Sequence, residues 1–284
     1  MLRTTYKRLR KSHFYRQALR WQLSLQSRRY LADFAHIQSY ALFVGHGRSS
    51  HSLVAALLNA HPNMVIADEL DSLRYVNEGI SRSQLYTLII QSAARHAQKG
   101  NRKGDLRGRS YSYQVAGQWQ GKYEQLRVIG EASLATAYFH NNLPLLEKLE
   151  SLVQVPVKAI QVVRNPYDGI TRLSKVSQIS LDLATEHYFW VCERVKQFRE
   201  WFPAGNTILI HNEALIADPY SNLHRLTTFF GLPLPADYAA ACASILFKKP
   251  NQARHEAIWS PEAIAKVAKR IPHYDFLAGY SYDG

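Results

Sequence analysis

A Gly- and Ser-rich segment near residue 45 has the residue types that hold a phosphate group. Residues 39–58 read Ser-Tyr-Ala-Leu-Phe-Val-Gly-His-Gly-Arg-Ser-Ser-His-Ser-Leu-Val-Ala-Ala-Leu-Leu, which predicts a short apolar strand, a loop and an apolar helix. A loop of this kind directs backbone N–H groups and a helix N-terminus at one point, where the helix dipole also favours negative charge. The segment therefore predicts an anion site.

This loop differs from the Walker phosphate loop, G-x-x-x-x-G-K-[ST], at positions that an NTPase needs. It keeps the first Gly as Gly45 and the last hydroxyl as Ser52, whereas Ser50 replaces the second Gly and His51 replaces the Lys. An NTPase places that Lys on the β- and γ-phosphates. We therefore predict a phosphate site that is not an ordinary ATP site. The alternative is a serine-rich turn before an N-capped helix, without a ligand.

A second segment places an Arg at the carboxyl end of a predicted strand. Residues 159–163 read Ala-Ile-Gln-Val-Val and are followed by Arg-Asn-Pro-Tyr-Asp at 164–168 and by the start of a helix. Ligands of α/β proteins bind at the carboxyl ends of the strands, and the planar guanidinium of Arg suits a phosphate bidentately. The alternative is that Arg164 pairs with Asp168 and only ties the turn.

Together the two segments resemble the PAPS-dependent sulfotransferase family, of the bacterial type and with similarity to the tyrosylprotein sulfotransferases (PAPS is 3′-phosphoadenosine 5′-phosphosulfate). Residues 47–53, Gly-Arg-Ser-Ser-His-Ser-Leu, resemble the family's 5′-phosphosulfate loop, commonly P-R-S-G-T-[TS]-L. Residues 164–168 resemble its 3′-phosphate motif, R-[ND]-P-x-D. Weaker similarities follow in the family's order over residues 40–282, at His61-Pro62, Asp68-Glu69, 208–219, 229–232 and 277–280.

The resemblance implies that PAPS is the co-substrate, that adenosine 3′,5′-bisphosphate is the product and that no metal is required. It places the 5′ end of the nucleotide on the loop residues Gly47, Arg48, Ser49, Ser50, His51 and Ser52. It places the 3′-phosphate on Arg164, with Thr171, Arg172 or Ser174 beside it, and Arg172 stands where the family usually has a Ser. Basic residues of a late loop, for which surface charge is the alternative, complete this set: Lys248, Lys249 and Arg254.

The reaction implied by the resemblance is in-line transfer of a sulfonate group to an acceptor hydroxyl. Glu69 is the predicted general base, because tyrosylprotein sulfotransferases have their catalytic Glu at this distance from the same loop. A surface carboxylate is the alternative, and His46 or His51 would then serve as the base. Arg48 and His51 are also predicted to assist the leaving phosphate, since Ala132 stands where related enzymes often have a Lys.

Two other function classes stay open from the sequence alone. A P-loop small-molecule kinase would share the fold, but it would need magnesium and the Walker Lys. A non-catalytic nucleotide- or membrane-binding protein would fit the basic N-terminus and the missing Lys. The acceptor is also open, because a sugar, a lipid, a peptide and a small alcohol all carry a suitable hydroxyl.

The elements that must position these residues alternate between strands and helices. Strands are expected at 40–44, 64–67, 126–129, 157–163 and 207–210, and helices at 52–59, 83–97, 134–152, 182–202 and 219–231. Such alternation predicts a parallel sheet with right-handed crossovers. We therefore expect an α/β fold, a P-loop-type three-layer sandwich with a central parallel sheet flanked by helices. Residues 37–284 would form one domain, with a loop insertion near 100–121.

Composition limits the class of protein further. The 284 residues contain two Cys, Cys192 and Cys242, which are expected as buried thiols in a reducing cytoplasm. No apolar run approaches the ~18 residues that a membrane span needs, and no Cys/His cluster has the spacing of zinc ligands. The protein is therefore expected to be cytoplasmic, with peripheral membrane contact left open.

Residues 1–36 are predicted as a basic arm. Nine Lys and Arg residues precede the first acid, Asp33, within a formal net charge of +13 for the whole chain, and apolar residues are interleaved among them. Such a stretch suits an anionic membrane surface or an acidic partner, and a solvated, partly disordered arm is the alternative. No nucleic-acid partner is expected, because no signature of a DNA- or RNA-binding module accompanies the charge.

Overall fold

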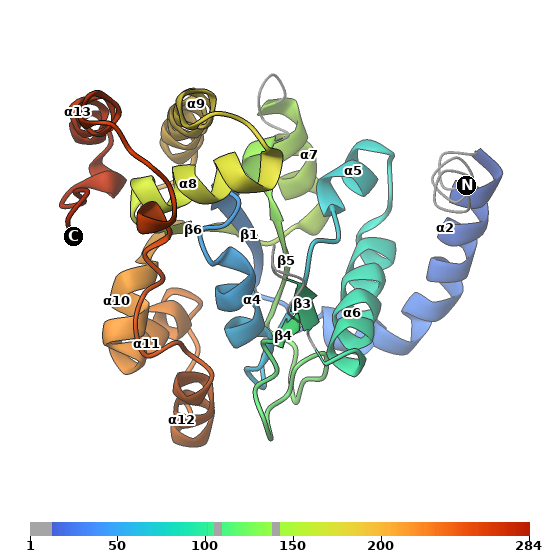
Figure 1. Cartoon of the computed structure of the whole chain (residues 1–284). Helices are drawn as coiled ribbons and strands as arrows, with labels where there is room; N and C mark the ends of the chain where they lie inside the picture. Colours follow the sequence, from blue (N-terminus) through green and yellow to red (C-terminus); the bar gives the residue numbers. More distant parts are fainter. Residues whose placement is uncertain (1–12, 101, 105–109, 138–142) are drawn as a thin grey trace.

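Five parallel strands form the centre of the molecule (Figure 1). The computed structural model describes residues 13–100, 102–104, 110–137 and 143–284. The sheet has the order β2-β5-β1-β6-β7, with β1 (Ser39–Gly45), β2 (Met64–Ala67), β5 (Val128–Leu134), β6 (Val157–Val163) and β7 (Thr207–His211). Because all pairings are parallel, the carboxyl ends of the strands share one edge. The loop after β1 and Arg164 after β6 therefore lie at neighbouring strand ends.

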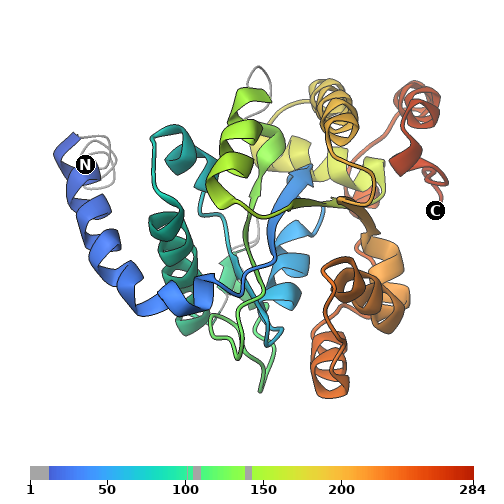
Figure 2. The same cartoon turned by 180° about the vertical axis from the view of Figure 1, so that it is seen from behind.

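Helices cover both faces of the sheet, as Figures 1 and 2 show from opposite sides. One face packs on α5 (Ser72–Asn77), α6 (Arg82–Gln98) and α7 (Leu143–Val153). The other packs on α4 (His51–Asn59), α10 (Asn212–Ala217), α11 (Pro219–Phe229) and α12 (Ala236–Ser244). A third cluster joins α8 (Pro166–Ser177), α9 (Leu181–Trp201) and α13 (Pro261–Arg270). The expected α/β three-layer sandwich is confirmed.

Burial on both faces explains why the strands read as continuous apolar runs rather than as alternating ones. Every residue of β1 is buried, and successive side chains enter opposite layers: Leu42 and Val44 pack with α6 and α7, whereas Ala41 and Phe43 pack with α4. Strand β1 is therefore fixed from both sides, and so is the start of the loop that follows it.

Strand β5 approaches β1 so closely that only glycine fits at one position. A Cβ atom on Gly130 would lie 2.1 Å from the carbonyl oxygen of Ala41. Just beyond this contact the pairing register shifts between Leu42 and Phe43. The chain then enters the 3-10 helix η2 (Ala135–Ala137), which comes to lie against the end of β1.

Some boundaries differ from the sequence-based predictions. β5 continues to Leu134, which pairs with Phe43 of β1, and η2 follows it, whereas α7 spans Leu143–Val153. Ser180, not Asp182, caps α9 by accepting a hydrogen bond from the Leu183 N–H at 3.2 Å. The insertion near 100–121 contains a short antiparallel pair, β3 (Arg102–Gly104) and β4 (Ser110–Ser112).

Much of the predicted basic arm is folded onto the domain. It forms α2 (His13–Ser27), the 3-10 helix η1 (Arg28–Tyr30) and α3 (Leu31–Phe34), and Leu23 and Phe34 are buried in the cluster that contains α6. A solvated arm therefore does not describe residues 13–34. Residues 1–12, which carry the rest of the predicted arm, lie outside the described residues.

Two further expectations concern the cysteines and the membrane. Cys192 and Cys242 are buried free thiols, as expected, and burial raises the pKa of both. Within the described ranges, none of the helices has both the length and the apolar character needed to cross a bilayer.

Candidate active site

The loop between β1 and α4 has a strained backbone. Gly45, Arg48 and Ser50 have φ values of +119°, +69° and +79°, a region that costs a non-Gly residue about 1–3 kcal/mol. Ser50 thus adopts a left-handed conformation at the position of the second Walker Gly. Alternation of right- and left-handed residues turns successive N–H groups toward one point and forms an anion-binding concavity. The loop after β1 therefore has a backbone that could hold an anion.

The loop also leaves polar groups without partners. The buried hydroxyl of Ser49 has no hydrogen-bond partner among the described residues, and the side chain of Ser50 makes no capping bond to α4. Buried polar groups normally find partners, and the first N–H groups of a helix need a capping group, water or a ligand. An anion at this point would satisfy both.

Contacts from neighbouring elements hold the start of the loop in place. The Thr136 hydroxyl of η2 donates to the carbonyl oxygen of Gly45 at 2.8 Å. His46 Nε2 donates to the carbonyl oxygen of Tyr188 at 2.8 Å, and the two rings stack at 3.9 Å between centroids. Burial lowers the pKa of His46 to about 4. His46, an alternative base in the sequence analysis, is therefore a neutral, buried residue that anchors the loop.

Arg164 links the two predicted segments directly. Its Nη1 donates to the backbone carbonyl of Arg48 at 3.4 Å, and its Nη2 donates to that of Asn251 at 2.5 Å. Its Nε is buried and has no partner among the described residues. The guanidinium therefore lies beside the loop and retains a free donor.

The carboxylate of Asp168 lies close to two arginines, Arg164 and Arg254. It accepts Arg254 Nη1 at 2.9 Å and the Arg254 backbone N–H at 2.8 Å, whereas Arg164 Nη2 lies 3.6 Å away. The predicted Arg164–Asp168 pair is thus present, but Arg254 is the closer partner. Two guanidinium groups share one carboxylate, so the cluster keeps a net positive charge. Arg254 comes from the 3-10 helix η3 (Ala253–Glu256), and the predicted Lys248 and Lys249 are exposed before it.

The structure gives other partners to three residues predicted beside Arg164. The buried Thr171 hydroxyl accepts the indole N–H of Trp259 at 3.1 Å, and the Ser174 hydroxyl donates to the carbonyl of Ile179 at 2.6 Å. Arg172 lies 4.0 Å from a carboxylate oxygen of Glu256. The Thr171 hydroxyl thus helps α8 to pack on Trp259, and the Ser174 hydroxyl binds the chain that follows α8. That these two hydroxyls flank a phosphate stays a prediction.

Two acidic residues follow β2 at the same edge of the sheet. Glu69 is exposed, and its φ of +45° is a strained value for a non-Gly residue. Asp68 pairs with His96 of α6 at 3.3 Å. This pair lines a small pocket, together with Ser52 from the loop after β1 and Tyr113. Sequence reasoning missed His96, because nothing near it in the chain points to Asp68.

A buried network fixes the turn that carries Glu69. The Asp71 N–H donates to the Ser133 hydroxyl at 2.8 Å. The carboxylate of Glu131 accepts the Ser72 hydroxyl at 3.0 Å and the Ser133 N–H at 2.9 Å, and burial raises the pKa of Glu131. Both ends of the turn are thus tied to β5. Ala132, the next residue of β5, is fully buried.

Metal-binding geometry is not found in this region. Across the described ranges, no group of three or more His, Cys, Asp and Glu residues is placed to hold a metal ion.

Comparisons with known proteins give similarity at the level of structure. No family model and no curated protein matches the sequence. The sulfotransferase domain of the Synechococcus PCC 7002 olefin synthase superimposes with a TM-score of 0.51 at 16% identity, over 84% of this chain and 96% of that domain. This chain has the sulfotransferase fold. A second domain, from the curacin biosynthetic pathway, gives a TM-score of 0.50 at 15% identity, over 84% of this chain and 99% of that one.

Within the sulfotransferase fold, residues near position 280 fasten the turn that follows Arg164. Glu213, after β7, accepts the Asn165 N–H at 2.9 Å and the Tyr280 hydroxyl at 2.7 Å. The Asn165 side chain donates to the carbonyl of Ser281 at 2.7 Å, and the Tyr280 oxygen lies 3.0 Å from Nδ1 of His211. This network holds Arg164 at its strand end.

Tyr280→Phe should therefore destabilise the protein and loosen this turn. The substitution keeps the ring but removes a partly buried hydroxyl bonded to a carboxylate, which should cost about 1.5–3 kcal/mol. Chemical denaturation measures the loss. Tyr282→Phe is the matched control, because its ring packs on Tyr167 and Trp259 and is retained. Equal effects of the two substitutions would contradict a specific role for the Tyr280 hydroxyl.

Proposed function

We propose that the protein is a sulfotransferase that moves a sulfonate group from PAPS to an acceptor hydroxyl. The observation that carries this proposal is the junction of the strained phosphate loop with Arg164, whose Nη1 reaches the backbone of Arg48 at 3.4 Å. Two anion-binding elements side by side suit a nucleotide with phosphates at both its 3′ and 5′ ends. A mononucleotide with one phosphate chain would need only the first of them.

The residues present fit such a nucleotide. The unpartnered Ser49 hydroxyl and the N-terminus of α4, which the Ser50 side chain does not cap, would hold the 5′ end, with Arg48, Ser52 and the exposed Gly47 around it. The unpartnered Nε of Arg164 would bind the 3′-phosphate. The net positive charge that Arg254 and Asp168 leave beside it supports that assignment. The exposed Lys248 and Lys249 are candidates at the rim.

In the proposed reaction, one set of residues acts on the leaving phosphate and another acts on the acceptor hydroxyl, on opposite sides of the sulfur. Bound PAPS supplies the sulfonate. The loop N–H groups, Arg48 and His51 balance the charge that develops on the leaving phosphate, which is the usual largest contribution to such catalysis. Glu69 accepts the proton of the acceptor hydroxyl while the oxygen of that hydroxyl forms a bond to sulfur. At the same time the bond between the sulfur and the 5′-phosphate oxygen breaks.

The order of the strands favours one side for the acceptor. The nucleotide would extend from the end of β1 toward Arg164 at the end of β6, so an in-line acceptor must approach from the opposite side, where β2 ends. Glu69 lies on that side, and so does the small pocket that contains Asp68, His96 and Ser52. We therefore place the acceptor between the phosphate loop and the turn after β2.

The first test is binding of adenosine 3′,5′-bisphosphate in the presence of EDTA. Calorimetry on the intact protein should give a saturable site, because the proposed anion contacts come from backbone N–H groups, hydroxyls and basic side chains, which need no metal ion. ATP with magnesium should bind much more weakly, since it has no 3′-phosphate for Arg164. A strict magnesium requirement, or a preference for ATP, would contradict the proposal and favour a kinase.

A further inference from the structure

The outer face of α2 and α3 exposes large apolar side chains. Trp21 is 69% exposed, and Leu25, one helical turn later, is 42% exposed. Leu31 on α3 is 55% exposed. Of the nine large apolar side chains that are exposed in the described ranges, these three fall within eleven residues. Figures 1 and 2 place α2 at the margin of the molecule, outside α6. The concentration indicates an interaction surface rather than scattered exposure.

The opposite face of α2 fixes the direction in which this surface points. Leu23 is buried against α6. The Gln84 amide of α6 donates to the carbonyl of Arg20 at 3.0 Å and to the Ser24 hydroxyl at 2.8 Å. The Gln91 amide donates to the Gln26 amide oxygen at 2.8 Å. Trp21 and Leu25 are therefore held outward on a docked helix.

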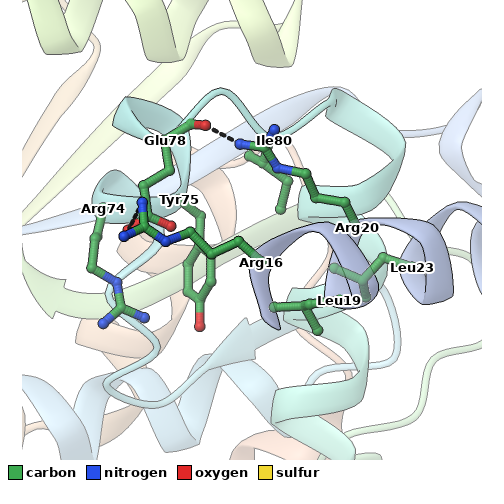
Figure 3. A pocket seen from close by; sticks show the side chains of 8 residues that line it. All are labelled: Arg16, Leu19, Arg20, Leu23, Arg74, Tyr75, Glu78 and Ile80. Carbon is green, nitrogen blue, oxygen red and sulfur yellow. Dashed lines mark hydrogen bonds and ion pairs between the residues drawn. The ribbon is translucent and has the colours of Figure 1, made fainter. Parts of the chain in front are cut away.

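The charge around this surface is positive. The sequences of α2, η1 and α6 contain no Asp or Glu. They contain Arg16, Arg20, Arg28, Arg29, Arg82 and Arg95. The flank toward α5 holds a small pocket, in which Arg16 and Arg20 approach Glu78 and Arg74 lies nearby (Figure 3).

Acidic residues bordering the surface are already engaged. The carboxylate of Glu78 lies 3.7 Å from Nη1 of Arg16, and the backbone carbonyl of Glu78 accepts a hydrogen bond from Nη2 of Arg20. Asp33 accepts the Tyr123 hydroxyl at 2.7 Å. In the sequence before α2, residues 1–12 add five basic residues and no acid.

We propose that the outer face of α2 and α3 docks on the surface of an anionic bilayer. Trp and Leu side chains suit the boundary between headgroups and acyl chains, and each Arg near an anionic surface should strengthen binding roughly fivefold. A second copy of the chain is a poorer occupant, because a two-fold contact would bring the arginines of both copies together. This inference does not depend on the proposed sulfotransferase activity.

Co-sedimentation of the intact protein with vesicles tests the inference. The protein should pellet with vesicles of phosphatidylcholine and phosphatidylserine, should remain in solution with pure phosphatidylcholine, and should be released by high salt, which screens surface charge. Trp21→Ser combined with Leu25→Ser should weaken binding about tenfold or more. The matched control is Leu183→Ser combined with Tyr220→Ser, at exposed apolar positions of α9 and α11.

A second pair of variants tests the charge without touching packing. Arg28→Gln combined with Arg29→Gln should weaken binding and reduce its salt dependence, whereas Lys196→Gln combined with Lys269→Gln, at exposed positions of α9 and α13, should not. Circular dichroism and thermal unfolding confirm that all variants fold. Equal pelleting of all variants would overturn the inference. So would a dimer that dissociates on Trp21→Ser, or binding to single-stranded RNA in preference to the vesicles.

Discussion

Glu69→Gln should abolish sulfonate transfer and leave the affinity for adenosine 3′,5′-bisphosphate nearly unchanged. The substitution preserves the shape of the side chain and removes only its basic form, so the loss should fall on the chemical step. A positioned general base contributes about 10²–10⁴-fold, and a loss of this size in kcat without a change in nucleotide Kd would identify it. The assay uses labelled PAPS with a panel of hydroxyl acceptors, and calorimetry measures the nucleotide.

Asp68→Asn is the matched comparison, because Asp68 is the neighbouring acid and its carboxylate pairs with His96. If Glu69 is the base, this variant should retain most of the turnover. Turnover of Glu69→Gln within a few-fold of wild type, together with a large loss in Asp68→Asn, would assign the proton transfer to the Asp68–His96 pair. If neither substitution matters, His51 at the start of α4 becomes the next candidate.

Arg164→Ala should weaken binding of adenosine 3′,5′-bisphosphate far more than binding of 5′-AMP. The proposed contact is a charge-assisted hydrogen bond to the 3′-phosphate, which is worth ~1.5–3 kcal/mol, or roughly 10- to 150-fold in Kd. 5′-AMP lacks that phosphate and should lose little. The difference between the two ligands, measured by calorimetry, separates recognition from folding.

Arg172→Ala provides the control for Arg164→Ala. Arg172 lies on α8, is partly exposed and has Glu256 as its neighbour, so its loss should change both affinities only slightly. Equal losses for both ligands in Arg164→Ala would mean that Arg164 mainly supports the fold through Arg48, Asn251 and Asp168. That outcome would remove the main support for the 3′-phosphate site.

The fold was predictable because its signals are local. Strands β1, β2 and β6 are short apolar runs that end in polar turns, and the structure places them within a residue of the predicted bounds. The start of α7 was not predictable in the same way. No local pattern marks residues 130–134 as a strand; they become one by pairing with β1 and β2, which lie far away in the sequence.

The candidate site shows the same division between local and distant signals. The loop after β1 and Arg164 at the end of β6 could be singled out as candidates because a few consecutive residues specify each of them. The partners of their neighbours were not found: Asp68 meets His96 from α6, Asp168 binds Arg254, and the Thr171 hydroxyl turns to Trp259. These contacts depend on how helices pack on the sheet, which no local pattern in the chain encodes.

The turn after Arg164 is held by Tyr280 and Ser281, which the ribosome adds much later than the turn itself. The carbonyl of Ser281 accepts a hydrogen bond from the side-chain amide of Asn165. The ribosome adds Ser281 to the chain 116 residues later than Asn165. β7, the last strand of the sheet, ends at His211, so the ribosome has made all five strands before it adds the residues that support the turn after Arg164. Since a domain folds as a unit, the proposed nucleotide site would be complete only once the residues near position 280 have been added.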